Sequence, residues 1–186
     1  MGFEVPGTLR IAISGKSGCG NTTVSSLLSE KLGIRLINYT FRQLAAEKGL
    51  TLAQVIENAK TDDSYDVYVD THQVELAMEG NCVLGSRLAI WMLKKADLKI
   101  YLYAAEETRA HRIFNREGGK IEDIVSFTSM RDSEDSRRYK KLYGIDNNDY
   151  SFADLVIDTA KYSPEQIVDL IVDEALKRSL VKETEL

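Results

Sequence analysis

Short apolar runs recur along the chain and alternate with longer segments of mixed polarity. The runs lie at residues 10–14, 34–38, 81–86, 98–104 and 153–159. Runs of this length, rich in β-branched and aromatic residues, predict strands that are buried on both faces. Because a longer segment separates each pair of runs, the pattern predicts a parallel sheet with helices on both faces, an α/β fold.

Helical spacing of apolar residues marks several of the intervening segments. Val24, Leu28 and Leu32 lie four positions apart, and the pattern stops at Gly33, a residue typical of helix ends. Ser163 and the proline after it predict the start of the last helix. Helices are predicted at residues 22–32, 40–49, 51–60, 71–80, 87–96, 106–119, 121–144 and 163–178.

Two segments are expected to be irregular. The acidic, tyrosine-rich stretch at residues 62–70 is expected to be a solvated loop, with recognition of a substrate as the alternative. The charged tail at residues 182–186 is expected to be frayed, as chain ends commonly are.

Length and composition indicate one globular domain. A chain of 186 residues with 44% apolar and 28% charged residues is typical of a single domain with a substantial core. The net charge of −5 argues against a nucleic-acid partner, because such proteins need a basic face.

The chain shows no targeting signal and no membrane segment. The start lacks a basic region followed by an apolar run, and no uncharged apolar run reaches membrane-spanning length. Cys19 and Cys82 lack metal-site spacing and are expected to be reduced thiols. We therefore expect a cytoplasmic, monomeric protein that binds no membrane.

A glycine-rich segment after the first strand has the spacing of a phosphate-binding loop. Gly15, Gly20 and Thr22 match the pattern G-x-x-x-x-G-K-[ST]. Backbone N–H groups of such a loop, and the helix that follows it, bind anionic oxygens, while the Thr22 hydroxyl suits Mg²⁺. A glycine-rich turn without a ligand is the alternative. The residues expected to bind phosphate are Gly15, Lys16, Ser17, Gly18, Cys19, Gly20, Asn21, Thr22 and Thr23.

Asn21 stands where the motif has lysine. An asparagine donates hydrogen bonds but brings no positive charge, and loss of one electrostatic donor typically lowers a rate by about 10²–10³-fold. Lys16 is the first candidate to supply the charge, the alternative being an exposed lysine on a turn. An arginine from elsewhere in the chain is the second candidate.

Basic residues recur on the two predicted helices joined by Gly118 and Gly119. Guanidinium groups bind phosphate oxygens through paired hydrogen bonds, so we interpret the two helices as a mobile lid that closes over phosphates. Solvated helix faces are the alternative. The spacing places three side chains on one face of each helix: Arg109, Arg112 and Arg116 on the first, and Arg131, Asp135 and Arg138 on the second.

With these motifs the chain resembles the cytidylate kinases, a family of nucleoside monophosphate kinases, in the compact form found in archaea and some bacteria. The resemblance runs in family order over nearly all of residues 10–172, and the "RDxxDxxR" and "RLAxWML" elements are its most specific parts. The matching segments are "SGKSGCGNTT", "FRQLAAEKG", "DTHQVELA", "RLAIWMLKKADLKIYLYA", "TRAHRIFNRE", "RDSEDSRRYKKLYGID" and "DLVIDTAKYSPEQI".

The resemblance implies the fold and the reaction. It implies a P-loop α/β domain over residues 1–186, and transfer of a phosphoryl group from ATP to CMP or dCMP with Mg²⁺ as cofactor. The core is expected at about 9–39, 81–105 and 153–178, the segment that binds the monophosphate at about 40–80, and the lid at about 106–145.

Roles for individual residues follow from the same resemblance. The loop from Gly15 to Thr23 is expected to hold the phosphates of ATP, Thr22 the Mg²⁺, and residues 158–166 to lie near the adenine ring. The acceptor-binding residues implied are Arg42, Asp70, Arg87, Arg131 and Asp135. The catalytic cations implied are Arg112, Arg116 and Arg138, joined by Lys16 if it replaces the missing lysine.

Two alternatives stay open at this stage. One is a kinase for another nucleoside monophosphate or a small phosphorylated metabolite on the same scaffold. The other is a regulatory nucleotide-binding protein that kept the fold after losing the lysine. Two basic helix faces argue against the second, because a shell that only binds nucleotide does not need them.

Overall fold

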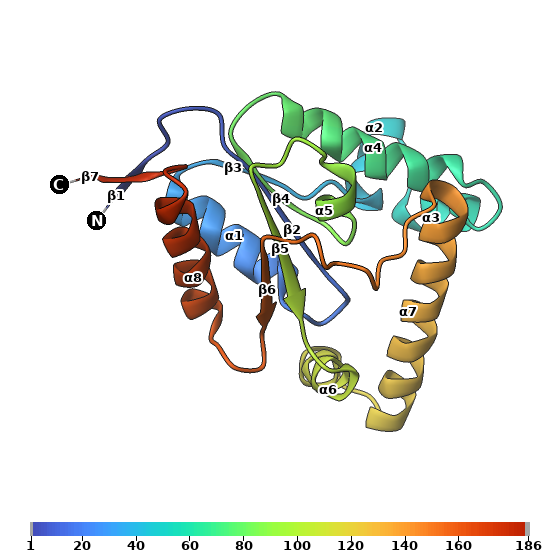
Figure 1. The fold of residues 1–186 in the computed structure, drawn as a ribbon. Coiled ribbons are helices and arrows are strands. Elements are labelled where there is room, and N and C mark those ends of the chain that lie inside the picture. The colour runs from blue at the N-terminus through green and yellow to red at the C-terminus, as the bar shows by residue number, and fades with distance from the viewer. Residues whose placement is uncertain (1, 185–186) are drawn as a thin grey trace.

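The computed structural model describes residues 2–184, and its core is a parallel sheet with β2 at the centre (Figure 1). The strand order is β3–β4–β2–β5–β6, so β2 pairs with β4 on one side and β5 on the other. This confirms the α/β fold that the apolar runs predict. The strands of the sheet are β2 (Arg10–Gly15), β3 (Arg35–Ile37), β4 (Cys82–Gly85), β5 (Leu98–Tyr103) and β6 (Leu155–Asp158).

Helices cover both faces of the sheet and extend beyond its carboxyl edge (Figure 1). The helices that pack against the sheet are α1 (Asn21–Leu32), α4 (Ser64–Met78), α5 (Ala89–Met92) and α8 (Pro164–Lys177). Those that extend toward the glycine-loop side are α2 (Phe41–Lys48), α3 (Leu52–Ala59), α6 (Glu106–Glu117) and α7 (Ile121–Tyr143).

Alternating residues of β2 divide the core into two layers. Ile11 and Ile13 belong to the cluster formed with α1 and α8, and both are fully buried. Ala12 belongs to the cluster formed with α4, α5 and Tyr139 of α7. Because both faces of the central strand are covered, its residues from Ile11 to Ile13 are all apolar and buried instead of alternating with polar ones. The glycine loop begins at Gly15, where this buried strand ends.

The helices α2, α3 and α4 pack on one another in a third cluster. Leu44, Val55 and Val69 contribute one buried side chain from each helix. Thr40 and Thr51 cap α2 and α3 with complete capping boxes, which end the preceding loops sharply. This unit borders one side of the glycine loop, while α6 and α7 border the other (Figure 1).

Three expectations about secondary structure are wrong. The stretch at 62–70 is helical from Ser64 on, because Asp66, Val69 and Gln73 repeat at helical spacing and are buried. The helix expected at 87–96 is the short α5 only, since Leu93 leaves helical geometry with ψ of 79° and turns into the core.

The third correction concerns the chain ends. Residues 182–184 form β7 (Lys182–Thr184), which pairs antiparallel with β1 (Gly2–Glu4). The tail is held because the opposite end of the chain supplies backbone partners for it. Residues 185 and 186 lie outside the described residues.

None of the helices in the described part of the chain is both long and apolar enough to span a membrane.

The close approach of β4 to α1 yields a stability prediction. A Cβ atom at Gly85 would lie 2.5 Å from Ser25 Oγ and 2.8 Å from Ser25 Cβ. We expect Gly85→Ala to lower the free energy of unfolding by about 1–3 kcal/mol through overpacking. Urea denaturation measures the loss. Gly80→Ala is the control, because a Cβ there would meet nothing within 4 Å; equal losses for both variants would contradict the prediction.

Candidate active site

The glycine loop joins the end of the central strand to α1. Gly18 and Gly20 have φ of 83° and 89°, a region that favours glycine. At Gly18 a Cβ would lie 2.9 Å from the backbone oxygen of Arg109, so the loop packs directly on α6. The first N–H groups of a helix have no partner within it, and Gly20 precedes α1 without a side-chain cap. The loop therefore has the geometry of an anion site.

A cleft of about 640 Å³ lies over this loop. Its lining comes from the loop, α2, α3, α4, the segment after β4, α6 and α7, segments that are far apart in sequence. Among the residues that the sequence singles out, those that do not line it are Cys19, Arg109, Arg112 and Asp135. Those that do include Gly15, Lys16, Ser17, Gly18, Gly20, Asn21, Thr22, Thr23, Arg42, Asp70, Arg87, Arg116, Arg131 and Arg138.

Two arginines of the cleft carry charge that the protein does not neutralise directly. The guanidinium groups of Arg42 and Arg131 make no ion pair or hydrogen bond with any residue in the range 2–184. Burial and the nearby Arg87 guanidinium both lower the pKa of Arg131. Two unpaired cations in the lining of one cleft favour a ligand with several negative oxygens.

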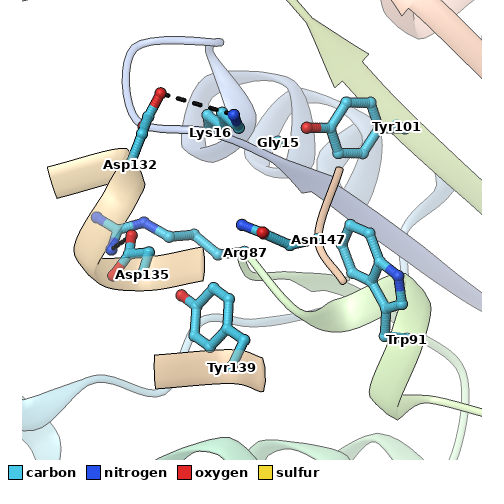
Figure 2. Close-up of a pocket in the computed structure, with 9 residues that line it drawn as sticks. All are labelled: Gly15, Lys16, Arg87, Trp91, Tyr101, Asp132, Asp135, Tyr139 and Asn147. Atoms are coloured by element: carbon cyan, nitrogen blue, oxygen red, sulfur yellow. Dashed lines mark hydrogen bonds and ion pairs between the residues drawn. The ribbon is translucent and has the colours of Figure 1, made fainter. Parts of the chain in front are cut away.

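Asp135 holds two other arginines in place. Its Oδ2 accepts a hydrogen bond from Arg87 at 2.8 Å (Figure 2). Its Oδ1 lies 3.2 Å from Arg138. Arg138 also pairs with Asp66 on α4 at 2.9 Å. Asp135 lines a smaller pocket that shares Lys16 and Arg87 with the cleft (Figure 2), and its hydrogen bonds orient arginines from two elements.

The structure separates the three arginines of α6 that the spacing placed together. Arg109 is 3% exposed, and its guanidinium donates to the Ser17 oxygen at 3.1 Å and to Asp132 at 2.6 Å. Arg112 donates to the Gly18 oxygen at 3.2 Å and to Thr159 Oγ1 at 2.8 Å. Both side chains therefore hold the backbone of the loop through its carbonyl oxygens. Only Arg116 is exposed and lines the cleft.

The side chains of Lys16 and Asn21 have different partners, although both residues line the cleft. Asn21 donates to the Ile13 oxygen at 3.2 Å and accepts from Ser25 at 3.0 Å, so its amide ties the loop to the strand and helix. Lys16 Nζ lies 3.7 Å from Asp132 Oδ2 (Figure 2). It also lies 3.0 Å from Asn148 Oδ1. Lys16 is thus the cation of the loop itself, and it pairs with Asp132 of α7.

The inner face of α4 adds acidic groups to the cleft. Burial raises the pKa of Asp70 to about 6, although the Tyr143 hydroxyl donates to its Oδ2 at 2.7 Å. Burial also raises the pKa of Asp66, and the Arg138 guanidinium beside it opposes the rise. Asp66 and Gln73 were missed in the sequence. Their spacing from Asp70, four and three residues, is the helical signal that could have found them.

The two thiols match the expectation for reduced cysteines. Cys19 and Cys82 are free and buried, and burial raises the pKa of both. In the described residues no group of three His, Cys, Asp or Glu side chains could hold a metal ion.

The fold and the cleft define the class of protein: a P-loop kinase, with a glycine loop at the end of a central parallel strand that faces arginines from separate helices. Solved P-loop kinases share the fold. Shikimate kinase from Acinetobacter baumannii in complex with shikimate aligns with a TM-score of 0.65 at 19% identity, covering 94% of this chain and 96% of that one. Deoxyadenosine kinase from M. mycoides with bound dATP gives a TM-score of 0.54 at 19% identity, covering 89% and 98%.

Within that class the chain belongs to the cytidylate kinase-like family, whose model matches residues 10–161. Cytidylate kinase 2 of Borreliella burgdorferi is 47% identical over 178 residues, covering 94% of this chain and 99% of the relative. Cytidylate kinase of Pyrococcus horikoshii is 42% identical over 165 residues, covering 88% and 86%. Such relatives support a nucleoside monophosphate kinase that uses ATP as its phosphoryl donor.

The buried Asp70 yields a prediction about pH. Its pKa of about 6 in the folded protein, against 3.8 as the ordinary value, means that the folded state binds the proton more tightly. The contribution of Asp70 to stability therefore falls as pH rises from about 4 to about 6. Between pH 4.5 and pH 7 wild type should lose about 2 kcal/mol relative to Asp70→Asn, measured by denaturant unfolding at both pH values.

A second carboxylate variant controls for the loss of one negative charge. Asp173→Asn changes an exposed residue of α8. A stability difference between wild type and Asp70→Asn that is the same at both pH values would contradict the assignment.

The ion pair between Arg109 and Asp132 yields a prediction about stability. Arg109→Met leaves the Asp132 carboxylate, whose side chain is 14% exposed, without its closest cation. We expect a loss of about 3–5 kcal/mol, because removing one partner of a buried ion pair is strongly destabilising and leaves Asp132 only the more distant Lys16 at 3.7 Å. The double variant Arg109→Met with Asp132→Asn should lose less than the sum of the single variants in denaturant unfolding.

The exposed pair of Arg35 and Glu79 serves as the matched control. Their side chains are 49% and 58% exposed, so Arg35→Met should cost less than about 1 kcal/mol. Strict additivity of the Arg109 and Asp132 variants would show that the two residues do not act together.

Proposed function

We propose that the protein transfers the γ-phosphoryl group of ATP to CMP or dCMP, releasing ADP and CDP or dCDP. The observation that carries the proposal is the single cleft in which the glycine loop, arginines of separate elements and the acidic face of α4 meet. Membership of a family whose relatives are named cytidylate kinases supports cytidine as the acceptor nucleoside.

The donor phosphates are proposed to lie on the loop from Gly15 to Thr23. Backbone N–H groups and the start of α1 would bind the β- and γ-oxygens. The adenine is proposed to lie near residues 158–166. Arg112 supports this arrangement, because it links Gly18 of the loop to Thr159 of that segment. We therefore assign Arg112 a positioning role, in place of the direct role in catalysis that the family resemblance implies.

The acceptor is proposed to lie between α2, α4 and α7. Arg42 and Arg87 would bind its phosphate, and Arg131 would contact the acceptor nucleotide from α7. Asp135 would contribute by orienting Arg87, to which it is hydrogen-bonded at 2.8 Å. Asp70 would contact the base or the sugar from the floor of the cleft.

The chemistry then requires alignment and positive charge more than proton transfer. An ionised oxygen of the acceptor phosphate forms a bond to the γ-phosphorus. The bond from that phosphorus to the β,γ-bridging oxygen breaks, and ADP leaves with the electron pair. No general base is needed. Arg116 and Arg138, which line the cleft, are proposed to neutralise the charge on the transferring group.

The loop fits a magnesium ion carried in with the nucleotide. Mg²⁺ usually keeps several water and phosphate ligands and takes few from the protein. Thr22 is exposed on the first turn of α1 and lines the cleft, so its hydroxyl would be the protein ligand. The ion would supply positive charge to the β- and γ-oxygens.

Lys16 is proposed to supply the charge that Asn21 lacks. Both residues line the cleft, but the Asn21 amide is held by Ile13 and Ser25, whereas Lys16 carries a cation on the same loop. Asp132 and Asn148 hold the Lys16 ammonium group beside the loop. Arg116 and Arg138 are the arginines next in place for this role.

We further propose that the protein acts as a monomer in the cytoplasm. Loop, arginines and acidic face all come from one chain, so the proposed site needs no residue from a second copy.

A turnover assay tests the reaction. Coupled detection of ADP over CMP, dCMP, UMP and AMP should give the highest kcat/KM with CMP or dCMP. ATP binding in calorimetry without turnover on any acceptor would contradict the proposal and favour a regulatory nucleotide-binding protein.

The Lys16 variants test the source of the missing charge. Lys16→Ala should lower kcat by about 10²–10³-fold, because one well-placed electrostatic donor is lost. Adding Asn21→Lys to that variant should restore part of the rate. Lys177→Ala is the control, since this lysine is 74% exposed on α8. An unchanged kcat for Lys16→Ala would leave the role to a lid arginine.

A further inference from the structure

The buried polar groups that lack partners gather at one place in the fold. Among residues 2–184, the buried side-chain atoms without a hydrogen bond are Gln73 Oε1, Ser86 Oγ and Arg138 Nε. All three side chains line the cleft. A buried polar atom without a partner destabilises a folded protein, so their concentration here indicates a polar ligand that completes the bonds.

Gln73 is the most deeply buried of the three residues. It is 3% exposed and lies on the third turn of α4. Asp70 precedes it by three residues, so the two side chains share the helix face that lines the cleft. Arginines surround the phosphate side of the cleft, whereas Gln73 and Asp70 form an uncharged and an acidic group on its floor.

Apolar side chains line the same region of α2, α3 and α4. Phe41, Ile56 and Val69 come one from each of the three packed helices and all line the cleft. Ile56 is 46% exposed although it is a large apolar residue. Apolar walls with a few polar groups at one end suit a planar heterocycle whose edge carries the hydrogen-bonding groups.

The amide of Gln73 matches the edge of a pyrimidine. Cytosine presents an amino donor beside the ring acceptor N3, and a glutamine amide presents an acceptor beside a donor. Rotation of the amide would match the reversed pattern of uracil equally well. The neighbouring Asp70 carboxylate breaks this symmetry, because its oxygens attract an amino group and repel the O4 oxygen of uracil.

We propose that Gln73 reads the base of the acceptor, with Oε1 accepting from the cytosine amino group and Nε2 donating to N3. Asp70 gives the preference for cytosine over uracil, and Gln73 supplies the paired hydrogen bonds. This inference rests on the proposed function and names the residue that recognises the base.

Gln73→Met tests the role, because methionine keeps the length of the side chain and removes both polar atoms. The Kd of CMP in calorimetry and the KM for CMP should rise about 10–100-fold, with kcat changed less than about 3-fold. The Kd of an ATP analogue should stay the same. The Tm of the ligand-free variant should equal or exceed that of wild type, because an unpartnered buried acceptor is removed.

Gln73→Glu separates recognition from packing. Glutamate keeps the shape and an acceptor for the cytosine amino group but loses the donor to N3, so the KM for CMP should rise as it does in Gln73→Met. Either base keeps one hydrogen bond to the carboxylate, so the ratio of CMP to UMP affinity should change less than about 3-fold. Glu75→Leu is the control, because the Glu75 side chain is 72% exposed on the same helix. It should leave all these values unchanged.

The outcomes distinguish the two hypotheses. Wild type that phosphorylates CMP while both Gln73 variants keep its KM would overturn the role of Gln73 alone. A lower Tm for Gln73→Met with an unchanged KM would also overturn it, because that is the result of a packing role. Wild type that binds CMP without turnover would contradict the proposed reaction, and calorimetry would still decide the role of Gln73.

Discussion

The buried ion pair between Arg109 and Asp132 is the interaction on which the geometry of the site depends. Arg109 joins three segments, because it lies on α6, donates to the Ser17 oxygen of the loop and pairs with Asp132 of α7. A guanidinium that is 3% exposed needs all of these partners to offset its lost hydration. Lys16 also approaches Asp132, so the loop and the two helices share one carboxylate. The glycine loop is thus held against α6 and α7 by contacts that need no nucleotide.

The cleft over that loop keeps charges and polar atoms that a protein selected for stability alone would avoid. Arg42 and Arg131 lack anionic partners within residues 2–184, Asp70 is buried enough that its pKa rises to about 6, and Gln73 Oε1 accepts no hydrogen bond. Departures of this kind concentrate at functional sites, where a ligand supplies the missing charges and hydrogen bonds. A nucleotide would do so at both ends, since its phosphate oxygens suit the arginines and the edge of its base suits α4. The same unpaired charges and polar atoms that destabilise the ligand-free cleft would then bind the nucleotide.

Local sequence patterns predicted most of the secondary structure correctly. The apolar runs at 10–14 and 98–104 became strands of the sheet, and Ser163 caps α8 as its position predicts. The errors came where a distant partner decides the outcome. Residues 64–70 look like a polar loop because the acidic residues suggest solvent, yet Asp66 is paired with Arg138 of α7 and faces inward. Residues 182–184 are ordered only because β1 pairs with them.

By itself, the sequence determined the α/β fold, the position of the glycine loop, the presence of Asn21 where the motif has lysine, and membership of the kinase family. These depend on residue type and spacing along a short stretch of chain. The tertiary structure decided which side chains share the cleft. Arg109, Arg112 and Arg116 have helical spacing that places them together, yet only Arg116 lines the cleft, because the loop and residue Thr159 bind the other two. The only local signal for Gln73 is its helical spacing from Asp70. Burial and unpaired atoms are properties of packing between distant segments, so only the folded chain reveals them.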